Sequence, residues 1–275
     1  MFDGVHIGHK AVLSGAVKSE YRSVAVTFDS IPHKNGGSLL SREEKESKLK
    51  SFGIDEVLFL NFFEVKDLSP DEFLDMLAQR YAIGKICCGF NYRFGKKAAG
   101  DTAFLRAWCA ENGAEFFECP EVKKDGHTVS STYIKTLLLE GRVERVADLL
   151  GEEFSFTAPV IDGDKRGRTL GFPTANQLYP DTKAPLKNGV YQTIVTIDGQ
   201  DYDGVTNIGV RPTYITEYIS AETYILGFTG NCYGKPMKTR VVQRLRDEKP
   251  FSNREELIEA IRQNAEYVKA HSMVK

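Results

Sequence analysis

Apolar and polar residues follow two different periods in the first 150 residues of the chain. Short β-branched runs alternate with segments whose apolar residues recur at helical spacing, which predicts alternating strands and helices. We expect strands at 23–28, 56–60, 85–89 and 114–119, and helices at 10–18, 41–52, 69–81, 101–112, 131–140 and 143–150. Ser41 with Glu44, and Ser69 with Pro70, mark two of the helix starts. This alternation favours a parallel sheet with helices on its faces.

The pattern changes after Gly151. Closely spaced strand-like runs are joined by turns such as Asp198-Gly199, and an amphipathic helix at 253–271 closes the chain. The strand-like runs are 154–160, 189–197, 200–205, 221–226 and 237–242. Many strands with few helices predict a small antiparallel barrel or sandwich. We therefore expect two domains, 1–150 and 151–275.

Composition excludes several classes of partner. Apolar residues make up 41% of the 275 residues and charged residues 27%, as in ordinary globular proteins. A net charge of −2 and a pI near 6.3 provide no general attraction for nucleic acid or an anionic membrane, so phosphate binding must be local. The five cysteines form no CxxC pair, and there is no apolar run of membrane-spanning length. We expect free thiols and a cytoplasmic protein.

Two strings in the first domain are candidates for binding phosphate. FDGVHIGH places His6 and His9 around Gly8 at a helix start, where backbone N–H groups attract anions. SSTYIK places Ser131, Thr132 and Lys135 at another helix start. The alternatives are two surface histidines in the first string and an ordinary helix cap in the second.

A third string, GFNYRFGKKAAGD, follows the expected strand at 85–89, at the edge where open α/β sheets bind ligands. In it, Asn91 is suited to recognising a ring edge, and Tyr92 or Phe94 to stacking. The alternative is a solvated basic loop.

The most specific string is GRTLGFPTAN. Gly167 and Gly171 permit a tight loop over phosphates, and Pro173 rigidly presents Thr174 and Asn176. Hydroxyl and amide oxygens suit Mg²⁺ that already carries nucleotide phosphates. Downstream, Glu222 interrupts a β-favouring run. It is either an exposed sheet residue or a base that accepts a proton from an attacking hydroxyl.

Taken together, these strings resemble the bacterial bifunctional riboflavin kinase/FAD synthetase family over essentially the whole chain. FDGVHIGH, GFNYRFG and SSTYIK resemble its FMN adenylyltransferase module. GRTLGFPTAN, NIGVRPTY, SAETYIL and RLRDEKPFS resemble its riboflavin kinase module. The resemblance implies a Rossmann-like nucleotidyltransferase domain, here without its first strand, followed by a six-stranded antiparallel Greek-key barrel with a terminal helix.

The resemblance also implies residue roles. Glu222 is the expected base of the kinase, Thr174 and Asn176 organise Mg²⁺ and phosphates, and Gly167 and Gly171 border the nucleotide. Arg246, Phe251 and Asn91 are the expected flavin contacts. His6 and His9 stabilise the transferring phosphate, while Ser131, Thr132 and Lys135 hold phosphate. Lys135 stands where the family usually has arginine.

The expected substrates are riboflavin, FMN and ATP with Mg²⁺, and FMN and FAD are products rather than bound cofactors. Two alternatives stay open at this point: a riboflavin kinase with an impaired adenylyltransferase module, and a non-catalytic flavin-binding regulator. Neither a nucleic-acid nor a membrane partner is expected, and the oligomeric state is not predicted.

Overall fold

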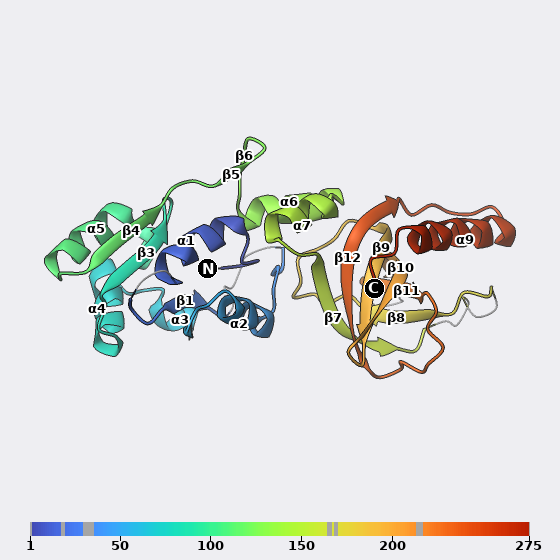
Figure 1. The fold of residues 1–275 in the computed structure, drawn as a ribbon, viewed down its shortest axis with the longest axis horizontal. Coiled ribbons are helices and arrows are strands. Elements are labelled where there is room, and N and C mark those ends of the chain that lie inside the picture. The colour runs from blue at the N-terminus through green and yellow to red at the C-terminus, as the bar shows by residue number, and fades with distance from the viewer. Residues whose placement is uncertain are drawn as a thin grey trace. The chain divides into compact units, whose positions relative to one another are not determined.

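A computed structural model of the chain describes residues 2–17, 20–29, 36–163, 167, 170–212 and 217–274. The chain divides into two compact units, Met1–Tyr133 and Ile134–Lys275 (Figure 1). Each unit has its own buried core, so each is described separately.

The first unit consists of short strands and helices in the alternation that the sequence predicts. Its strands are β1 (Val24–Phe28), β2 (Glu56–Leu60), β3 (Lys85–Gly89), β4 (Glu115–Cys119), β5 (Lys123–Lys124) and β6 (His127–Thr128). Its helices are α1 (Ile7–Val17), α2 (Arg42–Ser51), α3 (Phe62–Val65), α4 (Pro70–Arg80) and α5 (Thr102–Glu111), with the short 3-10 turn η1 (Lys96–Ala98). The capping boxes expected at Ser41 and Ser69 are both present.

The parallel strands of this unit form two separate pairs, β1–β2 and β3–β4. Within the described residues, no ladder of backbone hydrogen bonds joins β1 to β3. A cavity of about 770 Å³ lies along both strands, and its wall includes Ala25 and Val26 of β1 and Cys87 and Cys88 of β3. The expectation of parallel pairing is confirmed, but the sheet is divided where this cavity lies.

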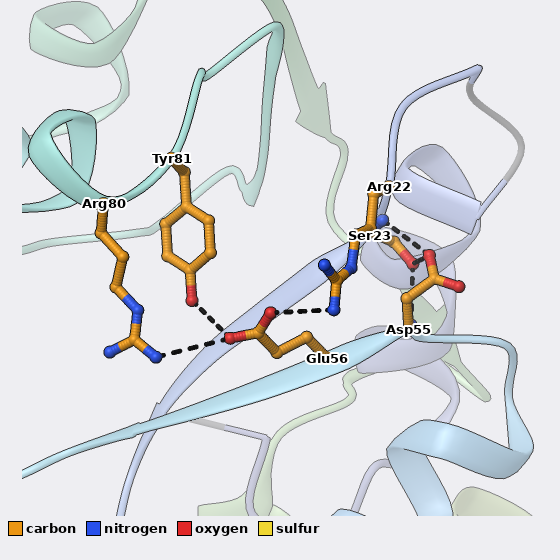
Figure 2. Close-up of polar contacts among 6 residues, drawn as sticks. All are labelled: Arg22, Ser23, Asp55, Glu56, Arg80 and Tyr81. Carbon is orange, nitrogen blue, oxygen red and sulfur yellow. Dashed lines mark hydrogen bonds and ion pairs between the residues drawn. The ribbon is translucent and has the colours of Figure 1, made fainter.

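Side chains hold the amino ends of the strands together (Figure 2). The Glu56 carboxylate accepts a hydrogen bond from the Tyr81 hydroxyl at 2.6 Å, with Arg22 at 3.3 Å and Arg80 at 3.6 Å. Asp55 accepts from both the backbone N–H and the hydroxyl of Ser23, each at 2.8 Å. Because Tyr81 precedes β3 and Glu56 begins β2, this cluster links the two strand pairs at one end of the cavity.

The second unit is built around a closed six-stranded antiparallel barrel, as expected from the resemblance. Its strands are β7 (Phe154–Ile161), β8 (Thr174–Leu178), β9 (Gly189–Ile197), β10 (Gln200–Pro212), β11 (Glu217–Ile225) and β12 (Pro236–Arg246), in the order β10-β11-β8-β7-β12-β9. Its helices are α6 (Ser131–Glu140), which begins at the end of the first unit, α7 (Val143–Leu150) and α9 (Arg254–Ala270).

One barrel strand, β8, was not predicted, because PTAN was interpreted as part of a loop. Its inward residues are Ala175 and Gln177 rather than β-branched side chains. Gln177 is fully buried, donates to the carbonyls of Ala158 (2.8 Å) and Met237 (2.7 Å), and accepts from Thr239 at 2.8 Å. A buried amide with its partners satisfied is compatible with the barrel core, but its polarity conceals the strand in the sequence.

The expected boundary at residue 150 differs from the division after Tyr133. Helix α7 packs against β7 and β12 of the barrel. Its apolar face is buried there through Val143, Val146, Leu149 and Leu150. Periodicity identifies this helix and its apolar face, but it does not say which neighbour covers that face.

All five cysteines are free thiols. In the part of the chain that the structure describes, no helix is both long and apolar enough to span a membrane.

Candidate functional site

The candidate phosphate-binding strings of the first unit meet at the cavity between β1 and β3. His6, His9, Asn91, Ser131 and Thr132 all line it. The Ser131 hydroxyl donates to the backbone carbonyl of Asp3 at 2.7 Å, which joins the FDGVHIGH and SSTYIK strings directly. The starts of helices α1 and α6 therefore border one cavity, and both are suited to attracting an anion there.

His6 forms the N-cap of α1. Its Nδ1 accepts the backbone N–H of His9 at 3.2 Å, and its carbonyl accepts the N–H of Lys10 at 2.9 Å. The imidazoles of His6 and His9 are stacked with centroids 3.6 Å apart. In the preceding turn, Val5 has a φ of +43°, a rare conformation for a β-branched residue. Such strain persists where the surroundings over-determine it, often at functional sites.

Burial keeps His6 neutral at pH 7. Desolvation lowers the pKa of His6 to about 4, although the nearby Asp3 carboxylate acts in the opposite direction. With Nδ1 accepting from His9, the proton of the neutral ring lies on Nε2. His6 therefore offers a ligand an uncharged N–H donor rather than a positive charge.

Acid should destabilise the first unit through His6. The unfolded chain binds a proton near the usual pKa of 6.5, and the folded chain only near pH 4. The full contribution to the free energy of unfolding is therefore present above pH 6.5 and is lost as the pH falls towards 4, by about 3 kcal/mol. Urea unfolding followed by the fluorescence of Trp108, the single tryptophan, measures this loss. His6→Asn keeps a capping oxygen without a titrating group, so an equally steep acid loss in this variant would contradict the assignment.

Asn91 follows β3 and is exposed at the cavity, as predicted for a residue at a strand's carboxyl end. The two aromatic residues beside it are not exposed stacking platforms. Tyr92 and Phe94 stack on each other at 5.7 Å within the core, and burial raises the pKa of Tyr92 to about 12. Two of the three basic side chains of the string form ion pairs, Arg93 with Asp101 at 2.7 Å and Lys96 with Asp67 at 3.7 Å.

Two lysines near these strings differ from expectation. Lys135 is half-buried on α6 and is not among the described residues that line the cavity. Lys48 of α2, which the sequence did not single out, donates to the carbonyl of Gly4 at 3.3 Å. Its only sequence signal is a basic residue in the last turn of a predicted helix.

In the second unit, strand pairing aligns three of the predicted kinase residues, Asn176, Glu222 and Arg246, in one row across the barrel. Asn176 of β8 pairs with Glu222 of β11, and Glu222 pairs with Asn207 of β10. Asn207 pairs in turn with Val190 of β9, which pairs with Arg246 of β12. We call this set of paired positions the Glu222 row. Asn207 is its one polar member to which sequence reasoning assigned no role.

Thr174 and Asn176 lie on the same face of β8 because side chains alternate along a strand. Asn176 is buried, and its Nδ2 donates to the Thr174 carbonyl at 3.4 Å. A side chain at Gly163 would overlap the Asn176 amide, so this glycine makes room for it. Two oxygen-bearing side chains therefore lie on the face of β8 whose register includes the Asn176–Glu222 pair.

The two predicted loop glycines each meet a backbone requirement. Gly167 accepts the N–H groups of Leu170 (3.1 Å) and Phe172 (2.9 Å), and a Cβ there would overlap the Phe172 carbonyl oxygen. Gly171 has a φ of +84°, in the left-handed region that favours glycine. Residues 168 and 169 of this string lie outside the described residues. The loop ends with the Phe172 ring edge-on to Tyr224 at 5.2 Å.

At the other end of the Glu222 row, the Phe251 ring lies beside two cations. The Arg246 guanidinium is 5.6 Å and the Lys249 ammonium 5.3 Å from the ring centroid. Desolvation by burial lowers the pKa of Arg246. Within the described residues its Nε is buried and has no hydrogen-bond partner, so this end of the row suits a ligand acceptor.

Comparisons with known proteins identify both units. A family model described as FAD synthetase matches residues 1–133, and one described as Riboflavin kinase matches residues 150–272. A bifunctional riboflavin kinase/FMN adenylyltransferase of Listeria monocytogenes is 31% identical, with 98% of this chain and 90% of the relative covered. A protein of the same description from Pseudomonas fluorescens is 33% identical, with 99% and 90% covered.

One solved structure resembles the whole chain. It is titled as a macrolide-efflux protein from Streptococcus pneumoniae and superposes with a TM-score of 0.90. It is 28% identical in sequence, and the match covers 98% of this chain and 91% of that one.

Proposed function

The chain belongs to the bifunctional riboflavin kinase/FMN adenylyltransferase family, and from this premise we propose which of its residues carry each reaction. The barrel unit transfers the γ-phosphoryl group of ATP to riboflavin, giving FMN and ADP. The α/β unit transfers the adenylyl group of a second ATP to FMN, giving FAD and pyrophosphate. Because both family models match, a kinase alone or a non-catalytic regulator is not favoured.

The observation that carries the kinase assignment is the pairing of Glu222 with Asn176. Glu222 takes the proton from the 5′-hydroxyl of riboflavin as that oxygen attacks the γ-phosphate of ATP. Phosphoryl transfer depends mainly on positioning and charge neutralisation, which a rigid barrel face supplies well. Side chains alternate between the two faces of a strand, and the neighbours Ala221 and Thr223 are fully buried. Glu222, which lies between them, is therefore outside the barrel interior.

Mg²⁺ fits the residues next to Glu222. The Thr174 hydroxyl and Asn176 amide provide hard oxygen ligands, and the Asn176 Nδ2 already donates to a carbonyl, which leaves Oδ1 to face a cation. Within the described ranges no group of three or more His, Cys, Asp or Glu is arranged to hold a metal. The ion would therefore share Thr174 and Asn176 with the ATP phosphates, and when bound it neutralises phosphate charge.

Arg246 and Phe251 border the flavin at the other end of the row. The Arg246 guanidinium and the Phe251 ring offer a donor and a flat apolar face, which match the carbonyl edge and plane of an isoalloxazine ring. Gly167 and Gly171 shape the loop before Thr174 so that its backbone approaches the nucleotide.

In the α/β unit, the starts of α1 and α6 hold the polyphosphate of the second ATP. His6 donates from Nε2 to the transferring phosphate, and His9 lies against it in the stack. Because the Ser131 hydroxyl already donates to Asp3, Ser131 and Thr132 bind phosphate oxygens through backbone N–H groups at the start of α6. Asn91, which lines the same cavity, contacts the nucleotide or flavin. Lys135 contributes charge at longer range along α6.

These assignments place the adenylyltransferase site within residues 1–150 and the kinase site within 151–275. A cytoplasmic location, the absence of nucleic-acid and membrane partners, and the Mg²⁺ requirement remain predictions.

The function is tested by incubating the purified protein with riboflavin, ATP and Mg²⁺ and separating the flavins by chromatography. FMN should form first and FAD should follow. A second reaction supplied with FMN and ATP should yield FAD and pyrophosphate without riboflavin. Absence of FMN in the first reaction would overturn the kinase assignment, and absence of FAD in the second would overturn the adenylyltransferase assignment.

A further inference from the structure

Residues without an assigned role, from two of the strings, meet on the barrel surface. Asn207 and Gly209 belong to NIGVRPTY on β10, and Glu248 belongs to RLRDEKPFS, just after β12. The Asn207 Nδ2 donates to Glu248 Oε1 at 2.9 Å. The two strings are about 40 residues apart in sequence, so this contact is a specific product of the fold.

Gly209 supplies the space for this contact. A Cβ at Gly209 would overlap the Glu248 carboxylate. Gly209 is not among the glycines with positive φ. The glycine is therefore needed for the space it leaves, not for its backbone conformation. Asn207 and Gly209 lie on the same face of β10 because they are two residues apart. The carboxylate of Glu248 therefore occupies a notch that these two residues form.

The notch faces the catalytic side of the barrel. Glu222 pairs directly with Asn207, so both side chains are on one face, with the strands about 5 Å apart. Arg246 pairs with Val190 of β9, which is the strand on the other side of β10. To reach the notch, the chain after β12 crosses β9 towards Glu222. The Asn207–Glu248 bond thus fixes the start of the segment that runs on to Phe251.

We propose that Asn207 and Gly209 form a receptor for Glu248 that positions Arg246 and Phe251 beside Glu222 to receive riboflavin. Asn207 is then a positioning residue for the kinase reaction and acts through Glu248. The inference rests on the proposed kinase function, because it concerns where the flavin lies relative to the base. ATP is held on the opposite side of Glu222 by Thr174 and Asn176, so its KM should not depend on the receptor.

The test measures kcat and both KM values for FMN formation, together with riboflavin binding by fluorescence quenching. Gly209→Ala displaces only the end of a flexible side chain, so the barrel should fold normally. Gly209→Ala, Asn207→Ala and Glu248→Ala should each raise the KM and Kd for riboflavin by about five- to tenfold, which corresponds to about 1 kcal/mol, the net contribution of one ordinary hydrogen bond. The kcat and the KM for ATP should stay within about twofold.

Two further variants separate positioning from general damage. Glu248→Gln keeps an oxygen that accepts from Asn207 and should restore most of the riboflavin affinity, whereas the double variant Asn207→Ala/Glu248→Ala should be no worse than either single variant. Asp201→Ala is the matched control, because Asp201 also lies on β10 but its carboxylate bonds to Thr196 and Arg240. This variant should leave the KM for riboflavin unchanged.

The possible outcomes distinguish a failure of this inference from a failure of the proposed kinase function. If the wild-type protein neither binds riboflavin nor makes FMN, the kinase assignment fails. If it makes FMN, while folded Gly209→Ala and Asn207→Ala keep the wild-type KM and Kd for riboflavin, or lose kcat alone, the receptor is overturned.

Discussion

Replacing Glu222 with glutamine should lower kcat for FMN formation by about 100- to 10,000-fold, the usual contribution of a general base. Glutamine has the same shape but cannot take the proton of the 5′-hydroxyl. The barrel should remain folded, because the adjacent strand positions are anchored independently: the hydroxyls of Thr193, Thr206 and Thr223 form a buried chain with spacings of 2.8 and 2.9 Å.

Initial rates of FMN formation, with a thermal melt of the same preparation, measure this effect. Glu259→Gln makes the same chemical change on the exposed surface of α9, where the carboxylate accepts hydrogen bonds from Arg262 and Gln263 of its own helix. It should retain the wild-type rate. Undiminished turnover in Glu222→Gln would remove Glu222 from the role of base.

The Glu222 row shows what sequence patterns can and cannot predict. Glu222 stood out as a carboxylate in a β-favouring run, and Thr174 and Asn176 as oxygen donors after a proline. Their proximity depends on β8 pairing with β11, two segments more than 40 residues apart. No local pattern specifies that register. Asn207 was missed for the same reason, since its importance arises from its neighbours on other strands.

Local chemistry predicted the longer helices well, because their starts are encoded by adjacent residues, but it missed the four-residue α3 (Phe62–Val65). Ser41 with Glu44 and Ser69 with Glu72 form complete capping boxes, and Asp101 and Asn253 cap two further helices. Strand β10 was underestimated, with its end expected at Val205, because Asn207 and Gly209 resemble turn residues. Gly204 and Gly209 occur within the strand where neighbouring side chains need space, which is a tertiary requirement.

The first unit shows a second limit. Four strands and their parallel pairing were predicted, but the sheet is split by the cavity between β1 and β3. Unpaired strand edges along a cavity leave backbone donors and acceptors without ladder partners. The Glu56 cluster at the amino ends partly compensates by linking the strand pairs through Tyr81. Such a link joins residues that no periodicity connects.

Replacing His6 with alanine should lower FAD formation from FMN by about 100- to 1,000-fold, the effect of removing one preorganised donor from a developing charge. FMN formation in the barrel unit should be unchanged, which makes each molecule its own control. Because His6 also caps α1, the companion variant His6→Asn keeps a capping oxygen and separates lost catalysis from lost stability.

Both reactions are measured on the same sample by chromatography, with Trp108 fluorescence reporting whether the first unit is folded. His127→Ala removes an exposed imidazole of the same unit that stacks on Tyr133, and it should leave both rates intact. Equal loss of FMN and FAD formation in His6→Asn would contradict two separate sites. Undiminished FAD formation in a folded His6→Asn protein would show that the neutral Nε2 donor is not part of the reaction.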